Sequence, residues 1–175
     1  MLTKIDLCSL ALLKLGEKPI QSFTEDTTNA QLARTFYEPV IDSLLSSHPW
    51  RFAIKNYSLT KTLQDNFLIP VDVLRILGTS ANTYSVIGDR IHAAANKLEI
   101  TAIARCDSSK FPSHFVTVAS TKLAMEFCIP MSENQNMYRT LSAALDSEMH
   151  LAKFIDSTSD TNDKIASFSL LSSRF

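Results

Sequence analysis

The hydrophobic and polar positions of this chain follow a helical period at both ends and a strand period in the middle. Near the N-terminus, apolar residues recur at three- and four-residue steps between Thr3 and Gly16. Thr3 followed by Asp6 is typical of a capping box, and a glycine commonly ends a helix. These signals predict a short amphipathic helix that begins after Thr3 and ends at Gly16.

A longer helix is predicted from Asp26 or Thr28 up to Pro49. Thr28 and Gln31 have the spacing of a reciprocal cap. Pro39 lies inside the apolar pattern and lacks the amide that a helical turn needs, so we expect a kink or a local break there. The helix should end before Pro49, because a proline disfavours helical geometry in the residue that precedes it.

In the middle third of the chain the period changes to that of strands. Trp50, Phe52 and Ile54 recur at every second position, which predicts a strand that starts at Trp50. Three further segments have a strand-like composition: 73–79, 83–93 and 97–105. Gly88 and Asp89 suit the tight turn of a hairpin inside the second of these. We expect three or four short strands, which need helices packed on them to be stable.

Helical spacing returns after Pro112 and is predicted to end at Pro130. Ser132 and Gln135 predict a capping box for a last helix with one apolar face down to Ile155. The predicted fold is α+β and mainly α: an antiparallel helical bundle of about four helices, a small inserted antiparallel β-sheet subdomain and an extended C-terminal tail. The expected ranges are 1–49 and 110–157 for the bundle, 50–109 for the β subdomain and 158–175 for the tail.

The C-terminal stretch differs in composition from the rest of the chain. Residues 156–163 are small, polar and acidic, which is typical of a solvated linker. The apolar side chains beyond this linker need a partner: Ile165, Phe168, Leu170, Leu171 and Phe175. They can fold back on their own bundle, or they can dock on another chain as a short recognition segment.

Composition favours one compact unit and argues against several classes of partner. The chain has 175 residues, of which 45% are hydrophobic, and 17 Lys and Arg nearly balance 18 Asp and Glu. The basic residues are dispersed, so sequence-specific DNA binding is poorly supported. No apolar run approaches the roughly 18 residues that span a bilayer, and the opening segment lacks the cleavage site of a signal peptide.

The residues that could carry catalytic or metal chemistry are scattered. The three cysteines and four histidines are too far apart in the sequence for the close ligand pairs of a zinc site, and an odd cysteine count fits a reducing compartment. With only three glycines the chain has no phosphate-binding loop, and no serine lies in a nucleophile elbow. We therefore expect no enzyme activity, no cofactor and no metal.

The segment SLLSSHPWRFAIK, residues 43–55, places His48, Pro49, Trp50 and Phe52 at the end of the long predicted helix. It resembles the end of the long helix in the head-to-tail adaptor (connector) family of short-tailed bacteriophages, which includes tail tubular protein A. Further motifs are similar to those of the same family and come in the same order: LGEKPIQSF (15–23), IPVDVLRIL (69–77), YSVIGDRI (84–91) and the closing helix pair within 119–149. The resemblance extends from residue 2 to about residue 157.

This resemblance implies a structural virion protein. It implies a ring of about twelve copies that binds the portal protein, joins the head to the tail tube or nozzle protein and leaves a channel for DNA ejection. The near-neutral charge is compatible with DNA that passes without specific binding, because a strongly basic wall would hold phosphates. Assembly would take place in the cytoplasm of the bacterial host, without a membrane, and the protein would remain in the virion.

The resemblance also suggests roles for particular residues. His48, Pro49, Trp50 and Phe52 are expected to form a structural junction in which the indole fixes the helices against the sheet. The hairpin tip at Gly88 and Asp89 could face the next tail component, and the apolar tail residues could contact the portal or a neighbouring adaptor. Two other classes remain open: a helical protein–protein interaction module unrelated to virions, and a small hydrolase or nuclease of unrecognised type.

Overall fold

The computed structural model describes residues 1–132 and 134–158. In this part of the chain, helices lie at both ends: α1 (Lys4–Lys14), α2 (Thr28–Ser47), α3 (Ser113–Ser132) and α4 (Gln135–Thr158). Short strands lie between α2 and α3: β1 (Ile54–Thr60), β2 (Phe67–Leu68), β3 (Val73–Thr79), β4 (Tyr84–Ile87), β5 (Arg90–Ala93) and β6 (Lys97–Ala104). Two short 3₁₀ turns flank the strands, η1 (Arg51–Ala53) and η2 (Ser108–Lys110). The prediction of a mixed fold with antiparallel strands is confirmed.

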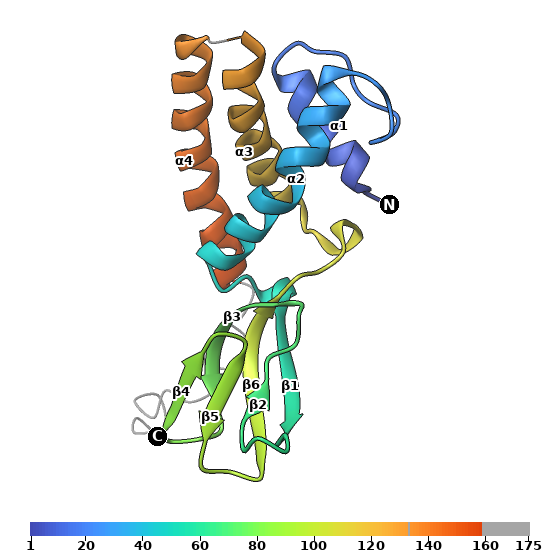
Figure 1. Ribbon diagram of the computed structural model, residues 1–175. Coiled ribbons are helices and arrows are strands. Elements are labelled where there is room, and N and C mark those ends of the chain that lie inside the picture. The colour runs from blue at the N-terminus through green and yellow to red at the C-terminus, as the bar shows by residue number, and fades with distance from the viewer. Residues whose placement is uncertain (133, 159–175) are drawn as a thin grey trace, which may run out of the picture.

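The helices pack together at one end of the molecule and the strands lie at the other (Figure 1). α3 packs against α4 along one flank and against α1 on the other, and α2 also contacts α3. Their shared core includes side chains that are at most 1% exposed: Leu7 and Leu12 of α1, Leu45 of α2, and Phe115 and Leu123 of α3. Burial of these apolar faces provides most of the stability of such short helices.

The ends of α1 lie where the sequence predicts them. The Asp6 backbone N–H donates to the Thr3 hydroxyl at 3.1 Å, and the Thr3 N–H donates to the Asp6 carboxylate at 2.8 Å. These reciprocal bonds satisfy N–H groups that have no partner inside the helix. Gly16, just past the end of the helix, has a φ of +78°, which favours glycine.

α2 differs from the prediction at its start and at its proline. The cap is Thr27, whose hydroxyl accepts a hydrogen bond from the Ala30 N–H at 3.2 Å, so the cap predicted at Thr28 is wrong by one residue. The helix is continuous through Pro39, and the expected break is absent. Val40 and Ile41, which follow the proline, are 6% and 4% exposed, and their burial offsets the hydrogen bond that the proline lacks.

The loop between α3 and α4 also departs from the prediction. α3 continues past Pro130 to Ser132. The side-chain oxygen of Asn134 accepts hydrogen bonds from the N–H groups of Asn136 and Met137, both at 3.1 Å, so Asn134 caps α4 in place of the predicted Ser132. An asparagine is as good an N-cap as a serine, and either residue fits the sequence pattern.

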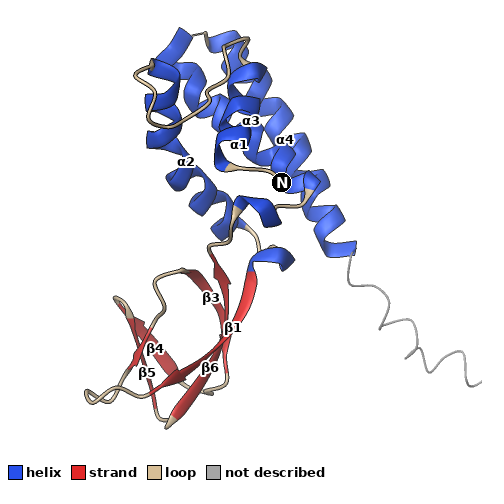
Figure 2. Cartoon of the chain, turned by 90° about the vertical axis from the view of Figure 1, so that its right-hand side faces the viewer, coloured by secondary structure: helices blue, strands red, loops and turns tan. Residues whose placement is uncertain are grey.

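The strands form two three-stranded sheets, where the sequence predicts a single small one. One sheet has the order β1-β6-β3 and the other β2-β5-β4, with antiparallel pairing throughout. The sheets pack on each other (Figure 2) around a second core that includes Leu59, Phe67, Ile91, Leu98, Ile100 and Ala102. β2 is too short to show a strand period, and its pairing with β5 places the β4–β5 hairpin in a separate sheet.

The segment that joins α2 to β1 forms a 3₁₀ turn before the strand begins. α2 ends at Ser47 and His48 is extended, as Pro49 predicts. The strand predicted from Trp50 is wrong for residues 50–53, because the Ala53 N–H donates to the Trp50 carbonyl at 2.9 Å in a 3₁₀ turn. This turn lets Trp50 and Ala53, three residues apart, both point into the core, where each is 0% exposed. The predicted hairpin turn at Gly88 is confirmed, and its φ is +62°.

Candidate functional site: the junction of helices and sheets

Trp50 is completely buried at the point where the chain leaves α2 and approaches β1. Its indole Nε1–H donates to the carbonyl oxygen of Leu44 at 2.9 Å, which satisfies an acceptor near the end of α2. Phe115 of α3 meets the indole edge-on, with ring centroids 5.1 Å apart. Trp50 therefore fixes the C-terminal end of α2 to the N-terminal end of α3.

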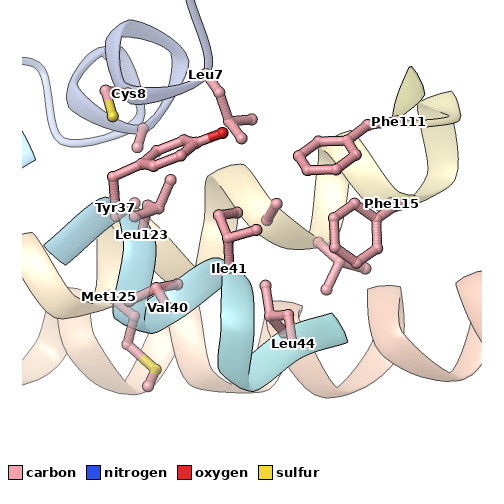
Figure 3. Packing of buried hydrophobic residues seen from close by; sticks show 14 of the residues in the cluster. Leu7, Cys8, Tyr37, Val40, Ile41, Leu44, Phe111, Phe115, Leu123 and Met125 are labelled. Atoms are coloured by element: carbon pink, nitrogen blue, oxygen red, sulfur yellow. The ribbon is translucent and has the colours of Figure 1, made fainter. Parts of the chain in front are cut away.

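Phe115 lies at the centre of an aromatic cluster drawn from three segments. Phe52 of η1 and Phe111 meet its ring with centroids 4.9 and 4.8 Å away, both in the edge-on geometry that aromatic pairs favour. Figure 3 shows Phe111 and Phe115 next to each other, beside Ile41 and Leu44 of α2. We call Trp50, Phe52, Phe111 and Phe115 the aromatic junction.

The β1-β6-β3 sheet is attached to the helices by apolar packing and by polar contacts. Ile103 of β6 is in the same buried cluster as Trp50, and Leu74 and Leu77 of β3 pack against that cluster. Arg105, just after β6, donates from Nε and Nη2 to the carboxylate of Asp42 at 2.6 to 3.0 Å. Arg75 of β3 donates to the Ser46 carbonyl at 2.8 Å. The paired bonds of Arg105 fix direction as well as distance. The arginines therefore add directional polar bonds between the sheet and α2 to the apolar packing of the core that contains Trp50.

α4 reaches the junction through Asp156, which is only 5% exposed. Its carboxylate accepts the Arg51 backbone N–H at 3.3 Å, and its Oδ2 lies 3.4 Å from the Nε2 of His48. The prediction of a solvated linker over residues 156–163 is wrong for its first three residues, because α4 runs on to Thr158. The composition of a polar run does not show whether its side chains contact another part of the folded chain. A polar run therefore does not by itself predict a solvated linker.

His48 makes the stability of the junction depend on pH. Burial lowers the pKa of His48, and Lys153 and Arg75 act in the same direction, against the attraction of Asp156. The folded chain thus binds a proton less readily than the unfolded chain, so stability falls as the pH drops below about 6.5. We expect His48→Gln to lose less stability than the wild type between about pH 7.5 and about pH 5.5 in urea unfolding. Equal losses in both proteins would show that His48 does not titrate in this way.

The other predicted site residues lie elsewhere. Gly88 and Asp89 form an exposed hairpin tip. The predicted tail contacts lie outside the described residues: Ile165, Phe168, Leu170, Leu171 and Phe175.

Cys8 and Cys128 are buried, and burial raises the pKa of the Cys8 thiol to about 12. Both cysteines therefore serve as small core residues.

Titratable groups gather in a cavity of about 290 Å³ next to the Arg105–Asp42 bonds. Its titratable lining residues are Lys4, Tyr37, Glu38, Asp42, Arg105, Cys106 and Asp107. Two larger cavities contain fewer such groups. A cavity of about 610 Å³ near the α3–α4 loop is lined in part by Tyr138 and Arg139, and one of about 530 Å³ beside β6 is lined in part by Tyr57 and Glu99.

Within residues 1–132 and 134–158, no group of three or more His, Cys, Asp or Glu is placed to hold a metal ion. Among the described residues, no helix combines the length and the apolar content that crossing a membrane requires.

Uncovered apolar side chains lie on two different helices, α1 and α4. Leu10 and Leu13 of α1, which we call the α1 patch, are 40% and 56% exposed. Leu151, Phe154 and Ile155 of α4, the α4 patch, are 59%, 64% and 37% exposed. The two patches belong to different helices, with α3 between them (Figure 1), and Lys14 of α1 reaches across to Glu148 of α4, with Nζ 3.8 Å from Oε1. Large uncovered apolar side chains of this kind are typical of contact surfaces.

The β end of the molecule is also incompletely covered. β4 is an edge strand, and all four of its residues are exposed. Its apolar members include Tyr84, Val86 and Ile87. An edge strand offers unpaired N–H and C=O groups to a partner.

Comparison with known proteins assigns no family to this chain. No protein-family model matches the sequence, and no curated protein matches it. The junction and the patches therefore supply the functional argument.

Proposed function

We propose that this chain is the head-to-tail adaptor of a short-tailed bacteriophage, a virion protein that forms a ring between the portal protein and the tail tube or nozzle protein. The observation that carries this proposal is that uncovered apolar side chains lie on two different helices, α1 and α4, which both pack on α3. Two different patches on one subunit favour a head-to-tail contact, in which the α1 patch of one copy meets the α4 patch of the next. Contacts of this kind generate a ring when the rotation between neighbours closes.

The junction supports the same function. A closed ring needs subunits of constant shape, since a small change in the angle between neighbours opens it into a helix. The aromatic junction, the Arg105–Asp42 bonds and Asp156 fix the helices and the sheet to each other. In the proposed adaptor, the helices form the antiparallel bundle and the strands form the inserted subdomain that the hydrophobic pattern predicts.

The β end is the part that we assign to the tail side. The exposed strand β4 lies in the β part, below the helices in Figure 1, and the hairpin tip at Gly88 and Asp89 lies at the end of this part that faces the helices. We therefore assign the open edge of β4, rather than the hairpin tip, to the contact with the next tail component. The chain carries 17 basic and 18 acidic residues, so a channel formed by its copies would let DNA slide past without holding its phosphates.

Charged substitutions in each patch test the ring directly. Leu13→Asp and Leu151→Asp should each prevent complete rings on portal rings of the same phage, because each removes one side of the contact between neighbours. An equal mixture of the two variants retains one intact contact, formed by the α4 patch of the first and the α1 patch of the second. We therefore expect pairs but no rings, measured by the mass of the adaptor species.

The matched control is Leu63→Asp, at a fully exposed position in the β part, which should form rings as the wild type does. Complete rings from either patch variant would overturn the proposal. A protein that stays monomeric and binds one partner through the α4 patch alone would support the interaction module unrelated to virions.

A further inference from the structure

The cavity of about 610 Å³ at the turn between α3 and α4, which we call the turn cavity, has no role in the function proposed above. It lies at the end of the helices that points away from the sheets (Figure 1). Its lining residues belong to neither apolar patch and not to β4, so the proposed ring contact does not use it. Its volume falls within the range of about 300 to 1,000 Å³ that is typical of ligand sites.

One part of the lining is apolar. It consists of Cys128 and Ile129 of α3 and the ring of Tyr138 of α4. Cys128 is 1% exposed and Ile129 is 56% exposed, so the cavity extends from the surface of the core to an uncovered isoleucine. An apolar group placed here would cover Ile129, which is favourable in proportion to the area removed from water.

The other part of the lining is polar and carries a single charge. The guanidinium of Arg139 lies there beside the side-chain amides of Asn134 and Gln135. Arg139 is exposed, and no carboxylate of residues 1–132 and 134–158 forms an ion pair with it. The first N–H groups of α4 are already used, because Asn136 and Met137 donate to Asn134. The guanidinium is therefore the cation that offers hydrogen-bond donors to an anion at this cavity.

We infer that the turn cavity binds the C-terminal residue of a partner chain, with its apolar side chain against Ile129 and Tyr138 and its terminal carboxylate on Arg139. A C-terminal residue carries both groups on one carbon atom. Tyr138 and Arg139 are neighbours in α4, so the cavity presents the two complementary groups close together. An arginine binds a carboxylate through paired, charge-assisted hydrogen bonds.

The elements around the cavity favour a chain terminus over a segment that passes by. The lining comes from two helices and the turn between them, and it contains no strand edge with which an extended segment could pair. Recognition therefore depends on side chains, and a terminal carboxylate supplies the anion that the lining lacks. The turn cavity lies away from the β part, whose β4 edge we assign to the tail. The partner is therefore the portal protein, and this identification rests on the proposed function.

Peptide binding to the full chain, measured by NMR without a portal, tests the inference. The probe is an acetylated Gly-Gly-Phe peptide with a free carboxylate, compared with its C-terminal amide and with acetylated Gly-Gly-Gly. The probe should shift the backbone signals of Ile129, Gln135 and Arg139. The Kd of the amide should be about tenfold higher, because the amide lacks the charge that pairs with the guanidinium. The peptide that ends in glycine should also bind more weakly, because it lacks the apolar side chain.

Arg139→Gln should remove the difference between the acid and the amide, and Arg139→Lys should restore part of it, because lysine keeps the charge. The matched control is Arg34→Gln, which changes an exposed arginine of α2 outside the lining and should keep the full difference. Circular dichroism should show all three variants folded like the wild type. Equal affinity of acid and amide for the wild type, or no shift near the cavity at millimolar peptide, would overturn the inference.

These outcomes are separate from those of the ring experiment. A chain that forms rings on portals but binds the acid and the amide equally would overturn the inference and leave the proposed function standing. A chain that distinguishes the acid from the amide but ignores portal rings would support the turn cavity as a binding site and contradict the proposed function.

Discussion

Replacing Trp50 with alanine is expected to lower the free energy of unfolding by about 3 to 5 kcal/mol. The indole is 0% exposed, so its removal leaves a large cavity between α2 and α3. It also leaves the Leu44 carbonyl without the indole N–H, which lies 2.9 Å away in the wild type. Urea unfolding followed by circular dichroism measures the loss, because the variant has no tryptophan to report fluorescence.

Trp50→Phe is the matched control. It keeps an aromatic ring against Phe115 and loses only part of the buried area and the indole hydrogen bond. We expect its loss to lie well below that of Trp50→Ala. Wild-type stability in the alanine variant would show that the indole does not hold the junction together.

Phe115→Ala is expected to cost a similar amount, about 3 to 5 kcal/mol. Phe115 is 0% exposed and meets the rings of Trp50, Phe52 and Phe111 with centroids 4.8 to 5.1 Å away. Removing it therefore breaks three aromatic contacts at once and separates η1 from the start of α3. The measurement is urea unfolding, with Phe115→Leu as the control that fills most of the volume.

The two positions should also be coupled. Because Trp50 and Phe115 contact each other, either substitution already weakens their shared interaction. The double variant Trp50→Phe with Phe115→Leu is therefore expected to lose less stability than the sum of its single variants. Strict additivity would mean that the two rings stabilise the chain independently and that the cluster is not a unit.

Local signals were sufficient for much of the fold. The capping box at Thr3, the end of α2 before Pro49 and the hairpin turn at Gly88 each depend on residues a few positions apart. A reader of the sequence can therefore recognise them from spacing alone. The three- and four-residue spacing of apolar residues in the four helices is also a local signal that can be recognised in the sequence.

Features that depend on contacts across the chain could not be found in this way. β2 has two residues and exists because β5 pairs with it. Trp50 and Ala53 break the strand period because both are buried on the same side. Asp156 lies in a polar run, and only the approach of α4 to Arg51 shows that its carboxylate is buried.

The junction was predicted only in part for the same reason. The tryptophan beside Pro49 indicated an important turn, and the structure places it in the core. Its partner Phe115 belongs to a helix that begins about sixty residues later, and 63 positions separate Asp42 from Arg105. No spacing rule relates residues at such separations. The apolar patches could not be predicted from the sequence either, because the exposure of Leu13 or Leu151 depends on where α3 lies.

Electron microscopy of the purified chain with portal rings of the same phage is the most direct test of the proposed function. We expect a second ring of about twelve copies seated on one face of each portal, with an open centre. Portal rings that look the same with and without the chain, beside a chain that remains monomeric, would contradict the account.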